Sequence, residues 1–364
     1  MDYLCDEDRD HLGCTVFQRT REDHKIAHSI EDETFLKVMG QGFCKNETNS
    51  WVAPLPFKPQ RPCLPNNKEQ ALKRLAALKR NFQKRPKMKE HFFAFMEKIF
   101  KNGHAEIAPP LKEKEEERWY LPIFGVYHPK KLRQICVVFD SSSQYKGISL
   151  NDVLLTGPDL NNTLIGVLRF RKEPVAITAD IQQMFHCFFV KEEHRDFLRF
   201  FWFRDNDPTK DIIEYHMKVH IFGNSPSPAV AIYGLRLSAR EGEKDFGEDV
   251  KQFVQRDFYV DDGLKSLPSP EAAISLLKRT QSALACSNLR LHKIASNSKE
   301  VMKAFPMQDY ADELKDLDLA TDSLPVQRSL GLIWDLKSNT FTFQVNSAKT
   351  LHTTGSLVYD QQPV

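Results

Sequence analysis

The chain has 364 residues, of which 41% are hydrophobic and 27% are charged, and its formal net charge is +2. This composition is typical of a globular protein with a large core and two or three subdomains, and it excludes a global basic field for nucleic acid. The seven cysteines are scattered without CxxC spacing, which argues against a zinc site or a disulfide framework. The acidic N-terminus lacks the apolar core of a signal peptide, and no apolar run is long enough to span a membrane. We therefore expect a cytoplasmic or nuclear protein.

The first segment, residues 1–65, is polar and irregular, and we expect a linker-like region there. One short helix is predicted over 29–39. The stretch 51–57 (Trp-Val-Ala-Pro-Leu-Pro-Phe) is extended and punctuated by proline, so it is suited to lie across another domain.

A basic helical segment is predicted over 66–110. Asn67 has the position of an N-cap, with Gln70 at the reciprocal capping-box position, and Pro86 ends the first helix. A second helix is predicted from about Met88 onward. The first helix carries basic side chains with almost no acidic neighbours: Lys73, Arg74, Lys79, Arg80, Lys84 and Arg85. Two interpretations of this face are open, a solvated helix surface and a contact to a phosphate backbone.

Short strands are predicted from Trp119 onward. Residues 121–127 and 133–139 form a hairpin pattern, and 161–170 has the pattern of a helix. Residues 173–180 then run through Val, Ala and Ile into Asp180, which is typical of a buried strand that ends in a carboxylate.

Another hairpin is predicted from residues 197–203 and 212–221, with 205–208 (Asp-Asn-Asp-Pro) as its turn. Ser227 and Pro228 have the pattern of an N-cap followed by proline at the first helical position, which opens a helix to about Arg240.

Two adjacent carboxylates lie in the stretch 258–263 (Phe-Tyr-Val-Asp-Asp-Gly). Because Asp-Gly is a turn signal, we expect 252–260 and 264–267 to be the two strands of a hairpin with both aspartates at its tip. Such a tip holds carboxylates outside a sheet, where a hard cation such as Mg²⁺ finds the oxygen ligands that it requires.

The remaining pattern predicts a helix from Ser269 and Pro270 to near Ala285, a strand over 289–294 and a last hairpin from 329–336 and 340–345. The predicted order of strands and helices indicates an α+β fold whose central sheet is a split βαβ (ferredoxin-like) antiparallel sheet with helices on one face. In such a sheet the two central strands are neighbours. Asp180 and the Asp261–Asp262 pair should therefore converge although they lie far apart in the sequence.

These residues resemble the motifs of reverse transcriptases, and six of them occur in order: Val137-Val-Phe-Asp, Asp180 with Phe185, Gly223 with Ser227-Pro228, Tyr259-Val-Asp-Asp, Leu291-His-Lys293 and Leu330-Gly331-Leu-Ile-Trp334. The sequences of residues 137–140, 149–158 and 219–223 are most similar to those of BEL/Pao-type LTR retrotransposon polyproteins. The resemblance covers about residues 25–345, including 31–36 and 51–57, which are similar to the segment between protease and polymerase.

The resemblance implies a fingers and palm domain over 119–336 and a truncated thumb or connection remnant over 337–364. It implies two Mg²⁺ ions, or Mn²⁺, about 3.5–4 Å apart, which act on a primer 3′-hydroxyl. Asp180 and Asp261 would bridge the ions, the carbonyl of Ile181 would bind one, and Asp262 would support them. Lys293 would donate a proton to pyrophosphate.

The other implied residues bind nucleotide and nucleic acid. The fingers residues Lys130, Lys131 and Arg133 would grip the triphosphate, as would the backbone near Gln183 and Met184. The ring of Phe185 would exclude a 2′-hydroxyl. Six residues would contact the template-primer: Gly223, Ser227, Pro228, Tyr259, Gly331 and Trp334. The implied partners are an RNA template, a DNA primer and deoxynucleotides.

Two departures from the family keep a second hypothesis open. Cys136 stands where a basic residue, usually Arg, is expected before Val-Val-Phe-Asp, and the chain carries no evident full thumb, ribonuclease H cluster or integrase zinc motif. The alternatives are therefore an RNA-directed DNA polymerase and an inactive or co-opted nucleic-acid-binding remnant. A ribonucleotide polymerase is disfavoured by Phe185.

Overall fold

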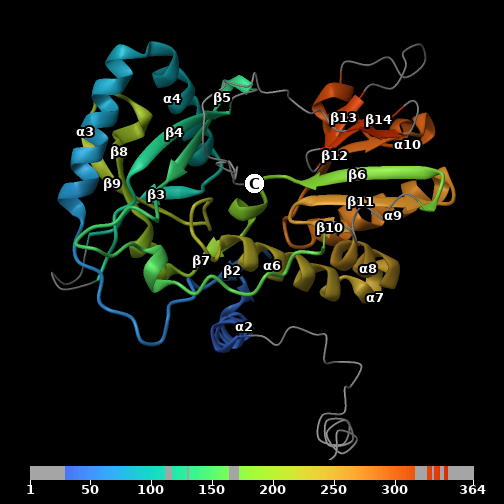
Figure 1. Ribbon diagram of the computed structural model, residues 1–364, viewed down its shortest axis with the longest axis horizontal. Coiled ribbons are helices and arrows are strands. Elements are labelled where there is room, and N and C mark those ends of the chain that lie inside the picture. Colours follow the sequence, from blue (N-terminus) through green and yellow to red (C-terminus); the bar gives the residue numbers. More distant parts are fainter. Residues whose placement is uncertain are drawn as a thin grey trace, which may run out of the picture. The chain divides into compact units, whose positions relative to one another are not determined.

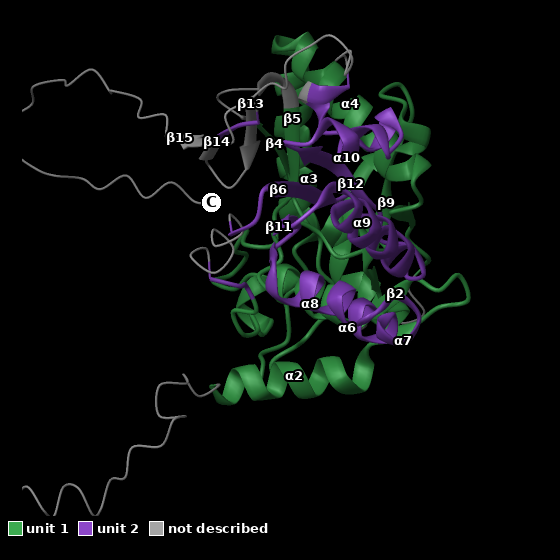
Figure 2. Ribbon diagram, turned by 90° about the vertical axis from the view of Figure 1, so that its right-hand side faces the viewer, with its two compact units in different colours: residues 1–160, 183–237 green, residues 161–182, 238–364 purple. Residues whose placement is uncertain are grey.

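The computed structural model describes residues 29–110, 117–128, 131–163, 172–315, 326–329, 332–336 and 340–342 (Figure 1). The chain forms two compact units, coloured separately in Figure 2. Unit 1 comprises residues 1–160 and 183–237, and unit 2 comprises 161–182 and 238–364. The predicted domain boundaries near 66, 119 and 337 differ from this division and stay predictions. Within the described ranges, no helix combines the length and the apolar character needed to cross a bilayer.

Unit 1 is a mixed α+β unit with three small sheets, ordered β1-β2-β7, β3-β9-β8 and β4-β5. Its helices and strands are α2 Ile30–Gly42, β1 Cys44–Lys45, β2 Trp51–Ala53, α3 Lys68–Lys84, α4 Pro86–Lys101, β3 Ala105–Ile107, β4 Ile123–His128, β5 Lys131–Phe139, β7 Phe189–Val190, β8 Arg199–Phe203, β9 Ile212–Met217 and most of α6 Ser227–Glu241. Its 3₁₀ turns are η1 Asn151–Val153, η3 Met184–Cys187, η4 Glu192–Leu198 and η5 Arg204–Asn206.

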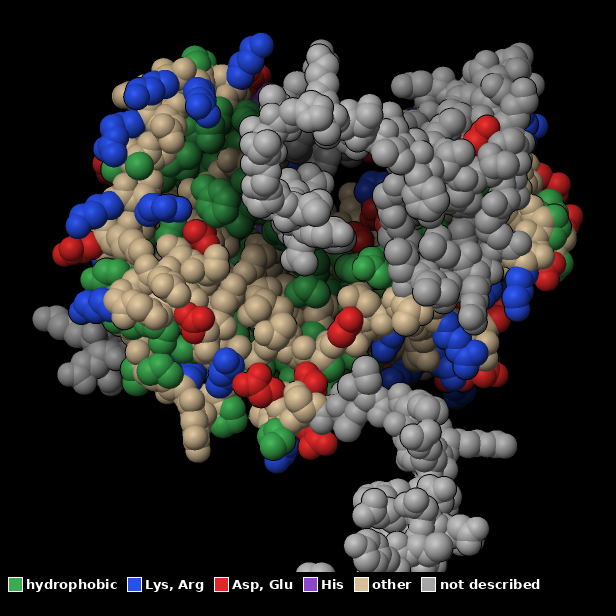
Figure 3. Space-filling model, in the orientation of Figure 1, with side chains coloured by type: hydrophobic (Ala, Val, Ile, Leu, Met, Phe, Trp, Pro, Cys, Tyr) green, Lys and Arg blue, Asp and Glu red, His purple; other side chains and the backbone are tan. Residues whose placement is uncertain are grey.

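Aromatic side chains from α3, α4 and β8 form much of the core of unit 1. Trp202 of β8 is fully buried, and its ring stacks on Phe92 of α4 at 5.5 Å between centroids and meets Phe82 of α3 edge-on. The two helices thereby bury their apolar stripes and leave their polar faces to solvent. Lys and Arg side chains gather along the edge that α3 and α4 form in Figure 3.

The predicted helix over 29–39 and the two predicted hairpins of unit 1 are confirmed. Ser29 caps α2 in a reciprocal capping box with Asp32. β4 pairs antiparallel with β5, and β8 with β9. The extended stretch from Trp51 lies against a distant part of the chain, because β2 pairs in parallel with β7 inside unit 1.

The predicted capping box at Asn67 is wrong. The side chain of Asn67 is fully buried and bonds the main chain of Tyr120 in both directions, donating to its carbonyl at 2.7 Å and accepting from its N–H at 2.8 Å. α3 therefore begins without a side-chain cap, and Gln70 donates to the Gln144 carbonyl instead. A long-range backbone contact has replaced the local one that the sequence pattern suggested.

Unit 2 is built around a four-stranded antiparallel sheet in the order β10-β11-β6-β12 (Figure 1). Its elements are β6 Val175–Ile181, the end of α6, α7 Glu243–Phe246, α8 Glu248–Arg256, β10 Phe258–Tyr259, β11 Asp262–Leu267, α9 Pro270–Ala285, β12 Leu291–Ser296, α10 Lys299–Lys303, the 3₁₀ turns η6 Met307–Asp309 and η7 Asp312–Leu314, and a small sheet of β13 Val326–Ser329, β14 Leu332–Asp335 and β15 Thr340–Thr342. Helices α8 and α9 pack against each other and against strands of the large sheet.

The predicted strand over 252–260 is wrong, because most of it is helix α8. Val250, Phe253 and Val254 are buried at helical spacing, and only Phe258 and Tyr259 remain as strand β10. The apolar side chains of this stretch satisfy a helix period as well as a strand composition, and packing against α9 and the sheet selects the helix.

Other predictions for unit 2 are confirmed or shifted. Helix α9 has the predicted ends, and the Ser269 hydroxyl accepts from the Ala272 N–H at its start. Strand β12 runs two residues later than predicted. In the predicted last hairpin, β14 lies within 329–336 and pairs antiparallel with β15, while Ser329 is the last residue of β13. The predicted helix over 161–170 lies outside the described residues, except for 161–163, which are not helical.

Candidate active site

Strand β6 brings Asp180 to the end of a central strand of the unit 2 sheet. Five of its seven residues are buried: Val175, Ala176, Ile177, Ala179 and Ile181. Burial of these side chains fixes the strand between β11 and β12, while Asp180 points away from the face occupied by its two immediate neighbours. The side chain of Asp180 is 16% exposed, so its carboxylate is only partly hydrated.

The hairpin between β10 and β11 places the two other carboxylates. Tyr259 pairs with Asp262, so the central turn residues are Val260 and Asp261. The prediction that both aspartates occupy the tip is therefore wrong, because Asp262 is the first residue of β11. The main-chain carbonyl of Asp261 accepts the N–H of Ile181 at 3.0 Å, which ties the turn to the end of β6.

Backbone strain accompanies this turn. Val260 has φ of 54°, a left-handed conformation that a β-branched residue rarely adopts. Positive φ at the first central residue is the requirement of a type II′ hairpin turn, where glycine is usual. Such strain persists only where the surrounding structure imposes it, and it clusters at functional sites.

Gly263 has a packing role in place of the predicted turn role. It pairs with Phe258 across the hairpin, and a Cβ on Gly263 would lie 2.6 Å from the Phe258 ring. That ring is buried against Phe253 of α8. The absence of a side chain at Gly263 thus leaves room for the Phe258 ring, which packs on helix α8.

The three aspartates converge as predicted from the order of elements. Asp262 and Asp180 are direct cross-strand partners on neighbouring antiparallel strands, and Asp261 adjoins both. Burial, with the charges of Asp261 and Asp180, raises the pKa of Asp262 to about 7. Burial and the charge of Asp180 also raise the pKa of Asp261. The site therefore concentrates more negative charge than it can stabilise by itself.

Two residues of β12 contact Asp180. The Lys293 ammonium donates to Oδ2 at 2.6 Å, and Nε2 of His292 lies 3.2 Å from Oδ1. Burial lowers the pKa of Lys293, but the bond to Asp180 and the three carboxylate charges outweigh burial and raise it. The family resemblance singled out Lys293 and not His292, which reaches Asp180 as its direct cross-strand partner.

The donor set is chemically suited to a hard divalent cation. Carboxylate oxygens are the ligands that Mg²⁺ and Mn²⁺ take, and the raised pKa values of Asp261 and Asp262 mark a cluster that a cation would relieve. As arranged in the described part of the chain, no group of three or more His, Cys, Asp or Glu side chains is poised to hold a metal ion. Asp180 instead contacts Lys293 and His292.

The predicted nucleotide-binding residues lie in unit 1. Gln183 adopts a left-handed conformation with φ of 50° and precedes turn η3, in which Met184 is buried and the Phe185 ring lies 6.2 Å from that of Phe222. Lys130 lies outside the described residues. Lys131 and Arg133 belong to strand β5, where only their backbone is described.

The predicted template-primer residues are divided between the units. In unit 1, Gly223 has φ of 113°, and a Cβ there would lie 2.9 Å from the Phe139 carbonyl oxygen. The close approach of the Phe139 main chain therefore requires glycine at this position. The Ser227 hydroxyl donates to the Ile221 carbonyl, and α6 begins at Ser227 itself, followed by Pro228. In unit 2, Tyr259 lies in β10 and Trp334 is buried in β14, while Gly331 lies outside the described residues.

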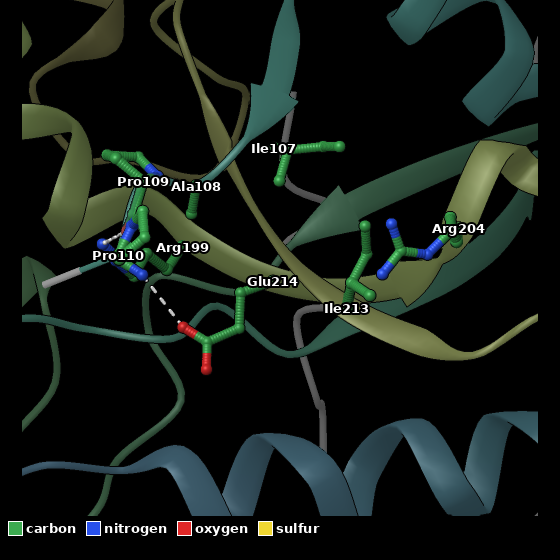
Figure 4. A pocket seen from close by; sticks show the side chains of 8 residues that line it. All are labelled: Ile107, Ala108, Pro109, Pro110, Arg199, Arg204, Ile213 and Glu214. Atoms are coloured by element: carbon green, nitrogen blue, oxygen red, sulfur yellow. Dashed lines mark hydrogen bonds and ion pairs between the residues drawn. The ribbon is translucent and has the colours of Figure 1, made fainter.

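A separate pocket in unit 1, of about 340 Å³, is lined by residues of β3, the segment after β3, β8, η5 and β9 (Figure 4). On one side, the buried Arg199 guanidinium contacts Glu214 at 2.9 Å, Asp196 at 2.7 Å and the carbonyl of Pro109 at 2.9 Å. This side of the pocket is therefore a structural ion-pair network.

Comparison with solved structures finds distant likenesses. No protein-family profile and no curated protein matches the chain. A solved foamy viral protease-reverse transcriptase, described in complex with double-stranded DNA, is similar to it with a TM-score of 0.42 and 13% identity. The match covers 76% of this chain and 45% of that one, so the chain spans less than half of the viral protein's length. A likeness this distant assigns neither family nor activity.

Proposed function

We propose that this chain is an RNA-directed DNA polymerase domain of a BEL/Pao-like retrotransposon, with its palm in unit 2. The observation that carries the proposal is the direct cross-strand pairing of Asp180 with Asp262, joined by the bond from the Ile181 N–H to the Asp261 carbonyl. The sheet order β10-β11-β6-β12, with α8 and α9 packed on it, is the order expected for a split βαβ palm.

The proposed chemistry is transfer of a nucleotide to a primer 3′-hydroxyl on an RNA template. Two Mg²⁺ ions, or Mn²⁺, would activate that hydroxyl and stabilise the leaving pyrophosphate when bound. Asp180, Asp261, Asp262 and the Ile181 carbonyl would hold them. In this proposal Lys293 gives its proton to the leaving group, and Phe185 excludes a 2′-hydroxyl so that deoxynucleotides are used.

The test is extension of a DNA primer on an RNA template with Mg²⁺, comparing the wild-type chain with Asp261→Asn. The variant keeps the size of the side chain and the main-chain bond to Ile181, and it removes one charge. We expect the variant to lose at least about 100-fold in rate, since electrostatic stabilisation of the transition state is usually the largest single contribution. Extension that is equal in both proteins would contradict the proposed role.

The inactive-remnant alternative has one observation in its favour. Cys136 is exposed on β5, opposite Val126, at the position where the family resemblance expects a basic residue. If neither protein extends the primer although both are folded by circular dichroism, Cys136→Arg is the next variant. Activity restored by arginine would locate the defect in triphosphate binding, and continued inactivity would favour the remnant.

A further inference from the structure

Two consecutive residues of one strand hold the two oxygens of one carboxylate. His292 lies against Oδ1 of Asp180 and Lys293 against Oδ2. In a regular strand, neighbouring side chains point to opposite faces, so they cannot reach the same group. The backbone of β12 must therefore depart from regular geometry at this point.

The departure is a β-bulge. His292 pairs with Asp180 and Ala295 pairs with Thr178, so β12 takes three steps where β6 takes two. Lys293 lies in this interval and has φ of 49°, a left-handed conformation that is costly for a residue with a Cβ. Bulges next to functional sites re-aim a side chain. Here the bulge turns Lys293 onto the Asp180 carboxylate.

The result is an internal counter-ion in a strongly acidic site. Asp180, Asp261 and Asp262 lie together, and among the described residues the only cationic Lys or Arg side chain that contacts these carboxylates is Lys293. The Lys293 side chain is 42% exposed, whereas Asp180 is 16% exposed. The ammonium can thus leave toward solvent without unpacking the sheet.

We infer that Lys293 forms an ion pair with Asp180 in the absence of metal and that a divalent cation displaces the lysine. Metal binding and release of Lys293 are then a single exchange. This inference rests on the proposed function, because it takes the three aspartates to be the metal site. It adds that the need to break the Lys293–Asp180 bond lowers the affinity for the metal. Lys293 becomes available as a proton donor only after the exchange.

The first experiment measures binding of Mn²⁺ and of Mg²⁺ by calorimetry, without nucleotide or nucleic acid. Lys293→Met should bind either ion at least 10-fold more tightly than the wild type, because no bond to Asp180 has to be broken. Lys303→Met is the matched control, since Lys303 is an exposed lysine of α10 in the same unit and its loss removes the same charge. We expect this control to stay within twofold of the wild type.

Outcomes separate the inference from the proposed function. If wild type and Lys293→Met bind with equal affinity, or if both lysine variants gain equally, the exchange is wrong while the metal site stands. If wild type, both lysine variants and Asp261→Asn all fail to bind either ion, the metal site itself is wrong, and the exchange falls with it. Lys293→Gln repeats the test should the methionine variant fold poorly.

A second experiment uses only the wild-type chain. Acylation of lysine amines by an activated ester is followed by mass spectrometry with and without Mg²⁺. Release from Asp180 should increase the modification rate of Lys293 severalfold when Mg²⁺ is added, while the rate of Lys303 stays constant. An unchanged or reduced rate at Lys293 at a saturating Mg²⁺ concentration would overturn the exchange.

Discussion

At the scale of single residues, Asp262 makes the fold sensitive to pH. Its pKa of about 7 in the folded protein exceeds the ordinary 3.8, so between these values the folded state keeps a proton that the unfolded chain has lost. Stability should therefore fall as pH rises through this window. Asp262→Asn removes this loss, and without metal it should be more stable than the wild type at pH 8 by up to about 4 kcal/mol.

Urea unfolding in EDTA at pH 5 and pH 8 measures this effect. The gap between variant and wild type should widen with pH. A gap that is the same at both values would mean that Asp262 is ionised throughout, and that its neighbours do not repel it.

His220 makes unit 1 sensitive to pH in the opposite direction. It is fully buried, and burial lowers its pKa to about 4. The unfolded chain binds a proton at this histidine near pH 6.5, whereas the folded protein does not. The free energy of unfolding therefore falls as pH falls from 6.5 toward 4. His220→Phe keeps a ring and removes the titration.

Between pH 8 and pH 5 the wild type should lose about 2 kcal/mol more than His220→Phe. Denaturant unfolding at both pH values gives the comparison. Parallel losses in the two proteins would show that other groups account for the acid sensitivity.

At the scale of elements, the turn between β10 and β11 has a strained backbone that lowers stability and fixes the position of Asp261. Val260 is held at φ of 54° beside Asp261, whose carbonyl bonds Ile181. Val260→Gly should relieve the strain and raise the free energy of unfolding by about 1 kcal/mol, the balance of strain relief against the added freedom of the unfolded chain. Primer extension should fall, because a looser turn no longer fixes Asp261.

Val260→Ala is the control for this turn, since it retains a Cβ and hence most of the strain. We expect it to resemble the wild type in both measurements. A glycine variant that is both less stable and fully active would refute a functional role for the strained conformation.

The elements also show how far the sequence can be read. β6 and α9 were predictable because their signals are local, a run of apolar residues into Asp180 and a Ser-Pro start with an N-cap. The convergence of Asp180 with Asp262 followed from the order of elements alone. The bulge at Lys293 was not predictable, because one extra residue in a strand leaves no mark in composition. The contact of His292 depends on the register that pairs it with Asp180, which the sequence also does not specify.

The errors have a common physical cause, which is competition between local and long-range contacts. Asparagine is a favourable N-cap residue, but the side chain of Asn67 forms its hydrogen bonds with the main chain of Tyr120. The stretch after Glu248 contains residues favourable to strands, yet packing of Val250 and Phe253 selects helix α8. Gly263 was assigned to a turn, whereas its small size serves the ring of Phe258. Each role depends on a partner distant in sequence or on packing that sequence periodicity does not specify.

At the scale of the whole molecule, the net charge is only +2, yet helix α3 carries a stripe of positive charge. Lys73, Arg80 and Lys84 are exposed on α3, opposite the buried face formed by Leu75, Leu78 and Phe82. The spacing puts the three cations on one stripe about 16 Å long. None of the three forms an ion pair with a residue that the structure describes, so their charge is available to phosphates.

This stripe predicts a salt-dependent contact to nucleic acid. Replacing Lys73, Arg80 and Lys84 by Gln should weaken binding to an RNA–DNA duplex and make the slope of log K against log salt shallower by about 2 to 3, because each phosphate contact releases a counterion. The matched control replaces the exposed Lys244, Lys278 and Lys303 of unit 2, which removes the same total charge. Fluorescence anisotropy from 50 to 300 mM KCl measures both. If the two triple variants lose slope equally, binding depends on net charge alone, and the basic face of α3 is the solvated surface that the sequence also allowed.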